Sequence, residues 1–197
     1  MKLFLGILTL AAATSSVAAP RQETAVLAGG CFWGMESVFE HVKGVTNVVS
    51  GYAGGRGSDA NYDAVSSEGT GHAEAVKITY NPARISYAQL LQVYFTVAHD
   101  PTQVNRQSPD VGPSYRSAIF PQNAEQARFA KAFIARLNSA HLFKAPIATH
   151  IESGGFYPAE EYHQGFARKH PDYPYIVVND RPKVVALQKK FPGLYRS

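Results

Sequence analysis

The amino-acid sequence predicts an α/β fold, a mixed sheet with flanking helices. Residues 73–80 alternate apolar and polar side chains, which is the pattern of a half-buried strand. The segment after Cys31 instead repeats its apolar side chains at i, i+3, i+4 and i+7, the pattern of one helix face. Patterns of both kinds interleave along the chain, and this order favours a two-layer α+β sandwich of one sheet and its helices.

The first predicted unit is a strand, a tight turn and a helix. The apolar run 25–28 predicts the strand, and Gly29 and Gly30 allow the backbone to turn sharply without a Cβ clash. The helix follows directly, with an apolar face made of Met35, Val38, Phe39 and Val42.

The middle of the chain predicts two strands and a helix. The strands are 45–52, which ends in a glycine-rich turn, and 73–80, which ends at Asn81 and the proline after it. The helix begins after Ser86, and Gln89 is placed to complete a capping box with that serine.

The later elements follow a long loop, residues 105–113. This loop is longer than most connections in a compact domain, and such loops often carry function. The elements predicted after it are a strand at 115–120, a helix that begins after Asn123, a strand at 147–152, and helices at 160–169 and 182–190.

Length and composition indicate one globular domain. The chain has 197 residues, of which 45% are hydrophobic and 17% charged, so it can form a core and is too apolar for a disordered chain. The net charge is +4, but the lysines and arginines are scattered, so no basic stripe predicts nucleic-acid binding. After the N-terminus no apolar run reaches the ~18 residues of a spanning helix, so we expect no stable membrane insertion.

The N-terminal residues 1–19 have the pattern of a secretory signal peptide. A charged start precedes the apolar run 3–13 and then small residues that suit cleavage after Ala18 or Ala19. We therefore expect residues 20–197 to form the mature domain, exported to the periplasm or secreted. A retained N-terminal anchor is the alternative.

Cys31, the single cysteine, is the first candidate for chemistry. It lies at the predicted start of a helix, where unpaired N–H groups and the helix dipole favour the thiolate, the reactive form. A buried structural cysteine is the alternative, but it would need neither the glycines before it nor Phe32 and Trp33 after it. A chain with one cysteine cannot form an internal disulfide.

Glu74 is the second candidate. The two-residue period of a strand places it on the same face as His72, with Ala73 and Ala75 on the other face. A carboxyl group in apolar surroundings has a raised pKa and can act as a general acid. A solvated carboxylate at the end of the strand is the alternative interpretation.

Tyrosines and titratable side chains in loops form a third group. Tyr62 and Tyr115 stand in or beside polar loops, where a phenol can donate to a polar oxygen while its ring packs, although a lone tyrosine more often only packs. The segment 157–164, which includes His163, is dense in polar and titratable groups. The acidic residues of this segment also suit a first helical turn, which is the simpler account of them.

Together these motifs resemble the A-class peptide methionine sulfoxide reductases over most of the mature chain. Residues 30–34 are similar to the nucleophile motif of that family, and residues 70–76 to its second signature. The resemblance implies an α/β sandwich related to the ferredoxin-like folds, and a thiol-dependent oxidoreductase of protein repair under oxidative stress. Its later signatures are similar to Asp110 with 115–119, and to 157–160 followed by 163–164.

The resemblance also implies a role for each candidate residue. Cys31 would attack the sulfur of methionine S-sulfoxide, free or in proteins, and become a sulfenic acid, while Glu74 would protonate the sulfoxide oxygen. Six side chains would bind the substrate: Phe32 and Trp33 around its S-methyl group, Tyr62 and Tyr115 at its oxygen, Asp110 shaping the site, and His163 beside it.

The chain departs from much of that family in one respect. Many members carry C-terminal cysteines that resolve the sulfenic acid, and this chain has none. The sulfenic acid must therefore be reduced by an external thiol, from a thioredoxin-like protein, a glutaredoxin-like protein or a small molecule. We expect no bound cofactor and no metal, and a monomer whose partners are oxidised methionine and a thiol reductant protein.

Two other classes of function fit parts of the sequence. Cys31 with His99 and Asp100, or with His163, would make a cysteine hydrolase or acyl transferase, but no clear motif supports this reading. A secreted binding module with an aromatic groove explains the tyrosines but not the glycine-flanked thiol. One cysteine and scattered histidines offer no recognised spacing of metal ligands.

Overall fold

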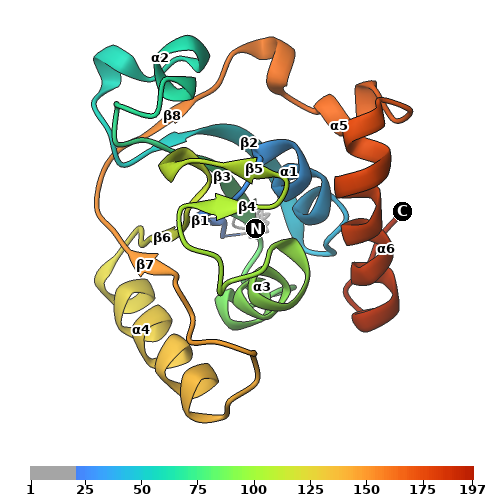
Figure 1. Ribbon diagram of the computed structural model, residues 1–197. Coiled ribbons are helices and arrows are strands. Elements are labelled where there is room, and N and C mark those ends of the chain that lie inside the picture. The colour runs from blue at the N-terminus through green and yellow to red at the C-terminus, as the bar shows by residue number, and fades with distance from the viewer. Residues whose placement is uncertain (1–20) are drawn as a thin grey trace, which may run out of the picture.

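The computed structural model describes residues 21–197. The predicted signal peptide, residues 1–19, lies outside them, so both this peptide and the domain boundary after it stay predictions. Within the described residues, a six-stranded sheet runs in the order β7-β6-β1-β3-β2-β8 (Figure 1). Its strands are β1 (Glu23–Gly29), β2 (Val45–Ala53), β3 (Ala73–Tyr80), β6 (Ser117–Phe120), β7 (His150–Ile151) and β8 (Phe156–Pro158).

The sheet is mixed and is flanked by helices, which confirms the predicted fold class. All neighbouring strands are antiparallel except β6 and β7, which run parallel. Helix α1 packs against the three central strands, and α6 packs beside α1 (Figure 1). The helices are α1 (Phe32–Glu40), α2 (Tyr62–Ser66), α3 (Tyr87–Val93), α4 (Ala124–Ser139), α5 (Phe166–Lys169) and α6 (Arg181–Lys190).

The alternation of side chains along the central strands separates two cores. Leu27 of β1 pairs with Val76 of β3, and both belong to the large core that includes the buried face of α1. The neighbouring pair, Ala28 and Ala75, belongs to a smaller core on the other face of the sheet. Because side chains alternate, Glu74 shares the α1 face with Val76.

Local caps set the beginnings of α3 and α4, as the sequence predicts. The Ser86 hydroxyl accepts the N–H of Gln89 at 3.2 Å, and the Gln89 side chain accepts the N–H of Ser86 at 3.0 Å, which completes the capping box. The Asn123 side chain accepts the N–H of Gln126 at 2.8 Å. Each such cap contributes about 1 kcal/mol to the stability of a helix.

The predicted helix at 160–169 is wrong. The segment forms a 3₁₀ turn (Glu161–His163) and then the short α5, with Gly165 between them at a φ of +61°. The side-chain amide of Gln164 donates to the carbonyl oxygen of Ser50 at 2.9 Å and accepts the Ser50 N–H at 3.0 Å. These bonds to β2 hold the segment in a path that a continuous helix could not follow.

Two predicted strands are shorter in the structure. The strand expected at 147–152 is reduced to the two residues of β7, and β6 begins only at Ser117 because Tyr115 ends a 3₁₀ turn (Pro113–Tyr115). The long loop contains a two-stranded hairpin of its own, β4 (Arg106–Gln107) with β5 (Asp110–Val111).

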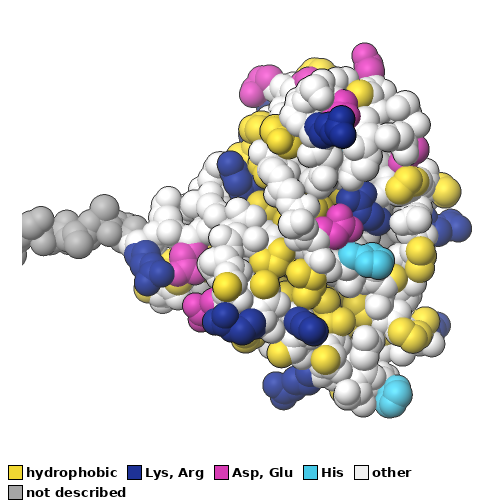
Figure 2. Space-filling view, turned by 90° about the vertical axis from the view of Figure 1, so that its left-hand side faces the viewer, with side chains coloured by type: hydrophobic (Ala, Val, Ile, Leu, Met, Phe, Trp, Pro, Cys, Tyr) yellow, Lys and Arg dark blue, Asp and Glu magenta, His cyan; other side chains and the backbone are white. Residues whose placement is uncertain are grey.

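The surface and the helices bear on what the protein can contact. Lysine and arginine side chains are interspersed with acidic ones on the face drawn in Figure 2, so that face carries no continuous basic stripe. None of the helices within residues 21–197 has the length and apolar character needed to cross a membrane.

Candidate active site

Cys31 occupies the N-cap of α1, directly after β1 and the two glycines. Gly30 has a φ of +86°, and a Cβ at this position would lie 2.6 Å from the side chain of Gln107. A Cβ on Gly29 would lie 2.8 Å from the ring of His99. Because residues 29 and 30 have no room for side chains, this turn requires glycines. The turn places Cys31 at the start of α1, where the cysteine is 8% exposed.

Glu74 is brought beside Cys31 by β3. Its Oε2 accepts the backbone N–H of Phe32, the residue after the cysteine, at 2.9 Å. Burial raises the pKa of Glu74 to about 8; the Phe32 hydrogen bond opposes this shift and the charge of Asp110 adds to it. The carboxyl is therefore mostly protonated at neutral pH, as a general acid must be. A solvated carboxylate does not describe it, since Glu74 is 4% exposed.

The predicted low pKa of the Cys31 thiol is wrong for the resting site. Burial raises the pKa of Cys31 well above its usual value, and the charges of Glu74, Asp180 and Asp110 raise it further. The backbone N–H of Trp33 lowers it, but this helix-start effect is the smaller one. Cys31 is therefore a thiol in the resting site, and the proton must leave its sulfur during the reaction.

Aromatic rings surround His163 next to the cysteine. The indole Nε1–H of Trp33 donates to Nδ1 of His163 at 3.2 Å, and the ring of Phe32 lies 4.9 Å from the imidazole. Phe166 stacks on Trp33 at 3.8 Å between ring centroids. Since Nδ1 accepts a hydrogen bond, a neutral His163 carries its proton on Nε2, and burial lowers its pKa, which favours that neutral form.

Tyr62, at the start of α2, and Tyr115, in the turn before β6, both lie near the carboxyl group of Glu74. The backbone N–H of Tyr62 donates to Glu160 at 2.9 Å, and its ring lies 4.7 Å from His163. Burial raises the pKa values of Tyr62 and Tyr115, and in each case the nearby charge of Glu74 raises the pKa further. Both phenols therefore stay protonated and can donate hydrogen bonds in this site.

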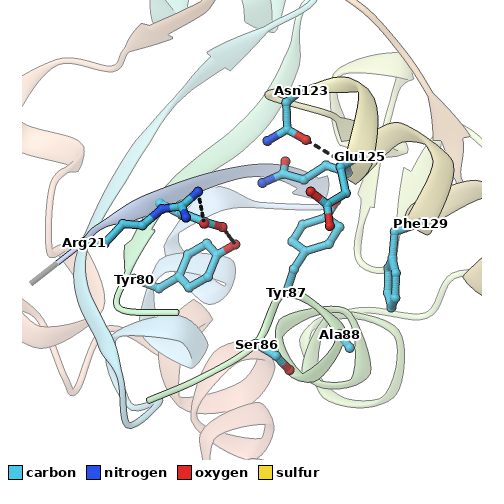
Figure 3. Close-up of a pocket in the computed structure, with 10 residues that line it drawn as sticks. Arg21, Tyr80, Ser86, Tyr87, Ala88, Asn123, Glu125 and Phe129 are labelled. Carbon is cyan, nitrogen blue, oxygen red and sulfur yellow. Dashed lines mark hydrogen bonds and ion pairs between the residues drawn. The ribbon is translucent and has the colours of Figure 1, made fainter. Parts of the chain in front are cut away.

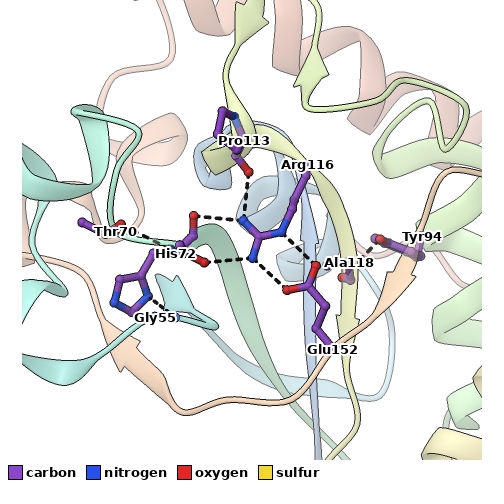
Figure 4. Close-up of polar contacts among 9 residues, drawn as sticks. Gly55, Thr70, His72, Tyr94, Pro113, Arg116, Ala118 and Glu152 are labelled. Carbon is purple, nitrogen blue, oxygen red and sulfur yellow. Dashed lines mark hydrogen bonds and ion pairs between the residues drawn. The ribbon is translucent and has the colours of Figure 1, made fainter.

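Arg116 holds the loop of Tyr115 against the start of β3 (Figure 4). Its guanidinium donates to the carbonyl oxygens of Gly71, His72 and Pro113 at 2.9 to 3.1 Å. The same group makes a two-pronged ion pair with Glu152, at 2.9 and 2.8 Å. Glu74 follows the bonded residues 71 and 72 by two positions, so Arg116 fixes the position of Glu74 relative to Tyr115.

A second tie joins the loop after α2 to the same turn. Both oxygens of the Glu68 carboxylate accept bonds from Ser114, the backbone N–H at 2.8 Å and the hydroxyl at 2.6 Å. Since α2 begins with Tyr62 and Ser114 precedes Tyr115, this tie fixes the two tyrosine loops to each other.

The eight site residues predicted from the sequence thus come together near the start of α1, from α1 itself, from α2, β3 and β5, and from the loops between them. Five further residues of this region were not predicted as site residues, and most of their partners lie far away in the sequence. Asp180 is fully buried beside Gly34 and bonds to Lys183 at 3.1 Å. The one local signal for Asp180 was its position three residues before Lys183. The five are Arg116, Glu160, Phe166, Tyr175 and Asp180.

Two histidines highlighted in the sequence lie elsewhere. His72 precedes β3, and its ring accepts the N–H of Gly55 at 3.2 Å (Figure 4) and contacts the carbonyl oxygen of Arg56 at 2.9 Å. His99 is buried, with its ring nitrogens bonded to the Tyr94 carbonyl oxygen at 2.9 Å and the Ser117 hydroxyl at 2.7 Å. Neither ring is available as a base for Cys31.

A cavity of about 460 Å³ lies away from the cysteine (Figure 3). Within it Tyr80 donates to Glu23 at 3.0 Å, and Arg21 pairs with the same carboxylate at 3.1 Å. It shares no residue with the site around Cys31 and is lined by Arg21, Glu23, Tyr80, Ser86, Tyr87, Ala88, Asn123, Glu125, Gln126 and Phe129.

Known proteins with related sequences are similar along nearly the whole described chain. Peptide methionine sulfoxide reductase MsrA 2 of Mesorhizobium japonicum is 58% identical over 179 residues, which cover 90% of this chain and 92% of that protein. MsrA of Halobacterium salinarum is 48% identical over 170 residues, covering 86% and 96%.

Solved structures agree with the sequence comparison. Reduced Mxr1 of Saccharomyces cerevisiae superposes with a TM-score of 0.70 at 32% identity, covering 77% of this chain and 87% of that one. Methionine sulfoxide reductase A of Corynebacterium diphtheriae gives a TM-score of 0.67 at 33% identity, covering 78% and 77%. Residues 23–193 match the family described as peptide methionine sulfoxide reductase, and the chain belongs to that family.

Proposed function

We propose that this protein reduces the S-epimer of methionine sulfoxide to methionine, both as the free amino acid and in peptides. The observation that carries the proposal is the pairing of a buried thiol with a protonated carboxyl: Glu74 bonds to the N–H of Phe32, next to Cys31. A sulfoxide needs a soft nucleophile for its sulfur and a proton for its oxygen, and these two groups supply both.

The chemical step balances without any added reductant. The Cys31 sulfur takes over the oxygen of the sulfoxide as the S–O bond of the substrate breaks, so cysteine is oxidised to a sulfenic acid and the sulfoxide is reduced to a thioether. Glu74 gives its proton to the departing oxygen, and the thiol proton restores the carboxyl. Because its pKa is raised to about 8, Glu74 can both give and take up a proton near neutral pH.

The remaining predicted residues would bind and orient the substrate. Tyr62 and Tyr115, held as phenols, would donate hydrogen bonds to the sulfoxide oxygen as its negative charge grows. Phe32 and Trp33 would seat the S-methyl group, and His163 would brace the indole through its Nδ1. Asp110 would shape the site through its charge, which acts on both Cys31 and Glu74.

Regeneration of the cysteine needs an external thiol, because this chain holds one cysteine. A first thiol condenses with the sulfenic acid to a mixed disulfide and water, and a second thiol then releases Cys31. A thioredoxin-type protein is the reductant we propose, since Mxr1 of Saccharomyces cerevisiae has been solved in complex with Trx2. Glutaredoxin-like proteins and small thiols are the competing donors in the test.

We also propose that the protein works as a monomer after export to the periplasm or the extracellular space. The charged start, apolar run and small residues of 1–19 support export. Fractionation of the source cells, with N-terminal sequencing of the mature chain, tests it; an uncleaved chain in the cytoplasm would contradict it. Sedimentation of the purified protein measures the state of association.

The decisive test is a turnover assay on the two sulfoxide epimers with a thioredoxin, a glutaredoxin or a dithiol as donor. We expect consumption of the S-epimer alone, and no turnover by a Cys31→Ser protein. Equal consumption of both epimers would contradict the proposal. Hydrolase activity that needs Cys31 would instead support the alternative enzyme class, which the engaged ring nitrogens of His99 disfavour.

A further inference from the structure

A buried ion pair at the beginning of α6 lies against the helix that begins at Cys31. Asp180 ends the π-helical turn Ile176–Asp180, is fully buried, and accepts a bond from the Lys183 ammonium at 3.1 Å. Both groups contact Gly34: a Cβ there would clash with the carboxylate and would lie 2.7 Å from the ammonium. Gly34 follows Cys31 by three residues, the spacing of neighbours on a helix surface. The pair is therefore a neighbour of the nucleophile.

Three carboxyl groups act on the Cys31 sulfur, and one of them has a cationic partner. Besides burial, the charges of Glu74, Asp180 and Asp110 raise the pKa of the thiol. Glu74 is mostly protonated at neutral pH, so the negative charge near the sulfur comes from the two aspartates. Within residues 21–197, Lys183 is the one cation that forms an ion pair with any of the three. One negative charge therefore remains uncompensated.

The two aspartates receive no second positive charge from the groups that bond to them. The Oδ2 atom of Asp180 is buried and has no hydrogen-bond partner in the described part of the chain. Asp110 accepts a bond from the hydroxyl of Tyr175, which is neutral. Burial raises the pKa of Asp110, and the charge of Lys183 opposes this shift, so the lysine acts on both aspartates. Removing either Asp180 or Lys183 thus changes the charge beside the sulfur by one unit.

The thiol that regenerates Cys31 must approach through this field. In that step the donor sulfur bonds to the cysteine sulfur, the S–O bond breaks, and the oxygen leaves as water with the protons of the sulfenic acid and of the thiol. Because Cys31 is 8% exposed, the donor brings the groups next to its own sulfur close to the aspartates. A recessed site with one sign of charge repels a donor of the same sign more strongly than open solvent does.

We propose that Asp180 and Lys183 are specificity-determining residues for the thiol donor. The net negative charge that they and Asp110 place beside Cys31 disfavours thiols that carry carboxylates and favours neutral or cationic ones. This inference rests on the proposed function, because it concerns the regeneration of the sulfenic acid. It makes small acidic thiols poor donors, and it requires a reductant protein to present neutral or cationic groups around its reactive sulfur.

The experiment uses three thiols of one size and different charge. Cysteamine, 2-mercaptoethanol and 3-mercaptopropionate carry an ammonium, a hydroxyl and a carboxylate at the same distance from the sulfur. Cys31 is first oxidised with methionine S-sulfoxide, and mass spectrometry of quenched samples then follows how fast each thiol consumes the sulfenic acid. The measured quantity is the rate with cysteamine divided by the rate with 3-mercaptopropionate. Comparing this ratio between variants cancels the intrinsic reactivity of each thiol.

The two members of the ion pair give opposite predictions. Asp180→Asn should lower the ratio and Lys183→Met should raise it, each about fourfold, the effect of a unit charge at roughly 10 Å in water on donors that differ by two charges. Lys189→Met, on the exposed side of the same helix, is the control and should stay within about 1.5-fold of the wild type. The rate with 2-mercaptoethanol should change less than the other two. High salt should bring all ratios towards one value.

The outcomes separate charge from structure and separate the two proposals. A packing defect slows all three thiols alike and leaves the ratio unchanged, so equal ratios in the wild type and both variants, or shifts in the same direction, would overturn the role of the pair. If the variants do not fold, the wild type decides, because a ratio that is independent of salt overturns the inference. A wild type that forms no sulfenic acid with the sulfoxide overturns the proposed function instead, and the thiol series can then be run on Cys31 oxidised with hydrogen peroxide.

Discussion

In the resting site Cys31 and Glu74 both keep their protons, and both lie at the start of α1. Cys31 remains a thiol because burial and three carboxyl groups outweigh the helix-start effect. Glu74 remains an acid because burial outweighs the hydrogen bond from Phe32. A neutral pair of this kind can be buried at little cost, whereas a thiolate beside a carboxylate could not. The enzyme therefore separates charge only when a sulfoxide is present to receive the proton.

The role of Glu74 predicts the effect of removing its proton. Glu74→Gln should slow the formation of the Cys31 sulfenic acid by roughly 10²–10⁴-fold in single-turnover measurements, since general acid catalysis contributes about this much. In the wild type the rate should fall as pH rises through about 8, where Glu74 loses its proton. The variant should lack this decline.

A matched control separates this role from burial alone. Glu36 of α1 is 2% exposed, and burial raises its pKa to about 7. Glu36→Gln can keep the bond that Glu36 accepts from the Gly165 N–H at 2.9 Å, and should leave the rate within about twofold. Near wild-type rates in a folded Glu74→Gln protein would assign the proton to another donor.

At the scale of elements, two ties hold the loops that carry the site. Arg116 uses all of its donor nitrogens on Glu152 and on the carbonyl oxygens of Gly71, His72 and Pro113. Glu68 bonds to Ser114 twice. The sheet and α1 thus fix Cys31 and Glu74, while side-chain bonds fix the tyrosine loops to that frame.

The hydrogen bonds of Arg116 predict that Arg116→Lys, which keeps the charge, still lowers the stability of the protein. Lysine cannot reproduce five hydrogen bonds in one plane, so Arg116→Lys should lower the free energy of unfolding by about 2 kcal/mol. Urea denaturation measures the change. Arg136→Lys on the exposed face of α4 is the control, and equal midpoints for the two variants would show that the tie contributes nothing.

The elements that follow from local chemistry are the ones the sequence predicts. The capping box of Ser86 and Gln89 needs only neighbours three residues apart, and the alternation around Glu74 needs only one strand. Arg116 and Tyr175 find their partners 36 to 65 residues away, and no local pattern encodes such contacts.

Tertiary contacts also explain the errors. The helix predicted at 160–169 fails because Gln164 bonds to β2. The low pKa predicted for Cys31 fails because the thiol is buried and because the charges of carboxyl groups from three other segments raise its pKa further. The order of the strands in the sheet cannot be read from one sequence for the same reason, since it is set by pairing between distant segments.

At the scale of the whole molecule, a buried polar network joins the two halves of the chain. His99 accepts the Ser117 hydroxyl at 2.7 Å, Thr149 bonds to the same hydroxyl at 2.7 Å, and Tyr94 donates to the Ala28 carbonyl oxygen at 2.7 Å. The network lies directly beneath the glycine turn of Cys31, because His99 fills the space beside Gly29.

This network predicts how stability depends on pH. Burial lowers the pKa of His99 to about 4, whereas an unfolded chain binds this proton near the usual 6.5. Between these values the unfolded state binds more protons, so the contribution of His99 is full above pH 6.5 and is lost as pH falls towards 4, by up to about 3 kcal/mol.

The measurement is urea unfolding of wild type and His99→Gln across this range. The difference in unfolding free energy should shrink as pH falls, while the raised pKa values of Glu36 and Glu74 tilt both proteins equally in the opposite direction. A difference that is independent of pH would mean that His99 is not buried in its neutral form.

The last prediction follows from the single thiol of the molecule. With no second cysteine to resolve the sulfenic acid, purified protein should reduce about one methionine sulfoxide per chain and then stop. The stalled chain should be about 16 Da heavier, and a dithiol should restart it through a mixed disulfide on Cys31. In excess oxidant the stalled cysteine should advance to sulfinic acid, which small thiols do not reverse, so activity should be lost permanently. Mass spectrometry of the stalled and overoxidised protein checks both steps, and repeated turnover without any added thiol would disprove this account of the cycle.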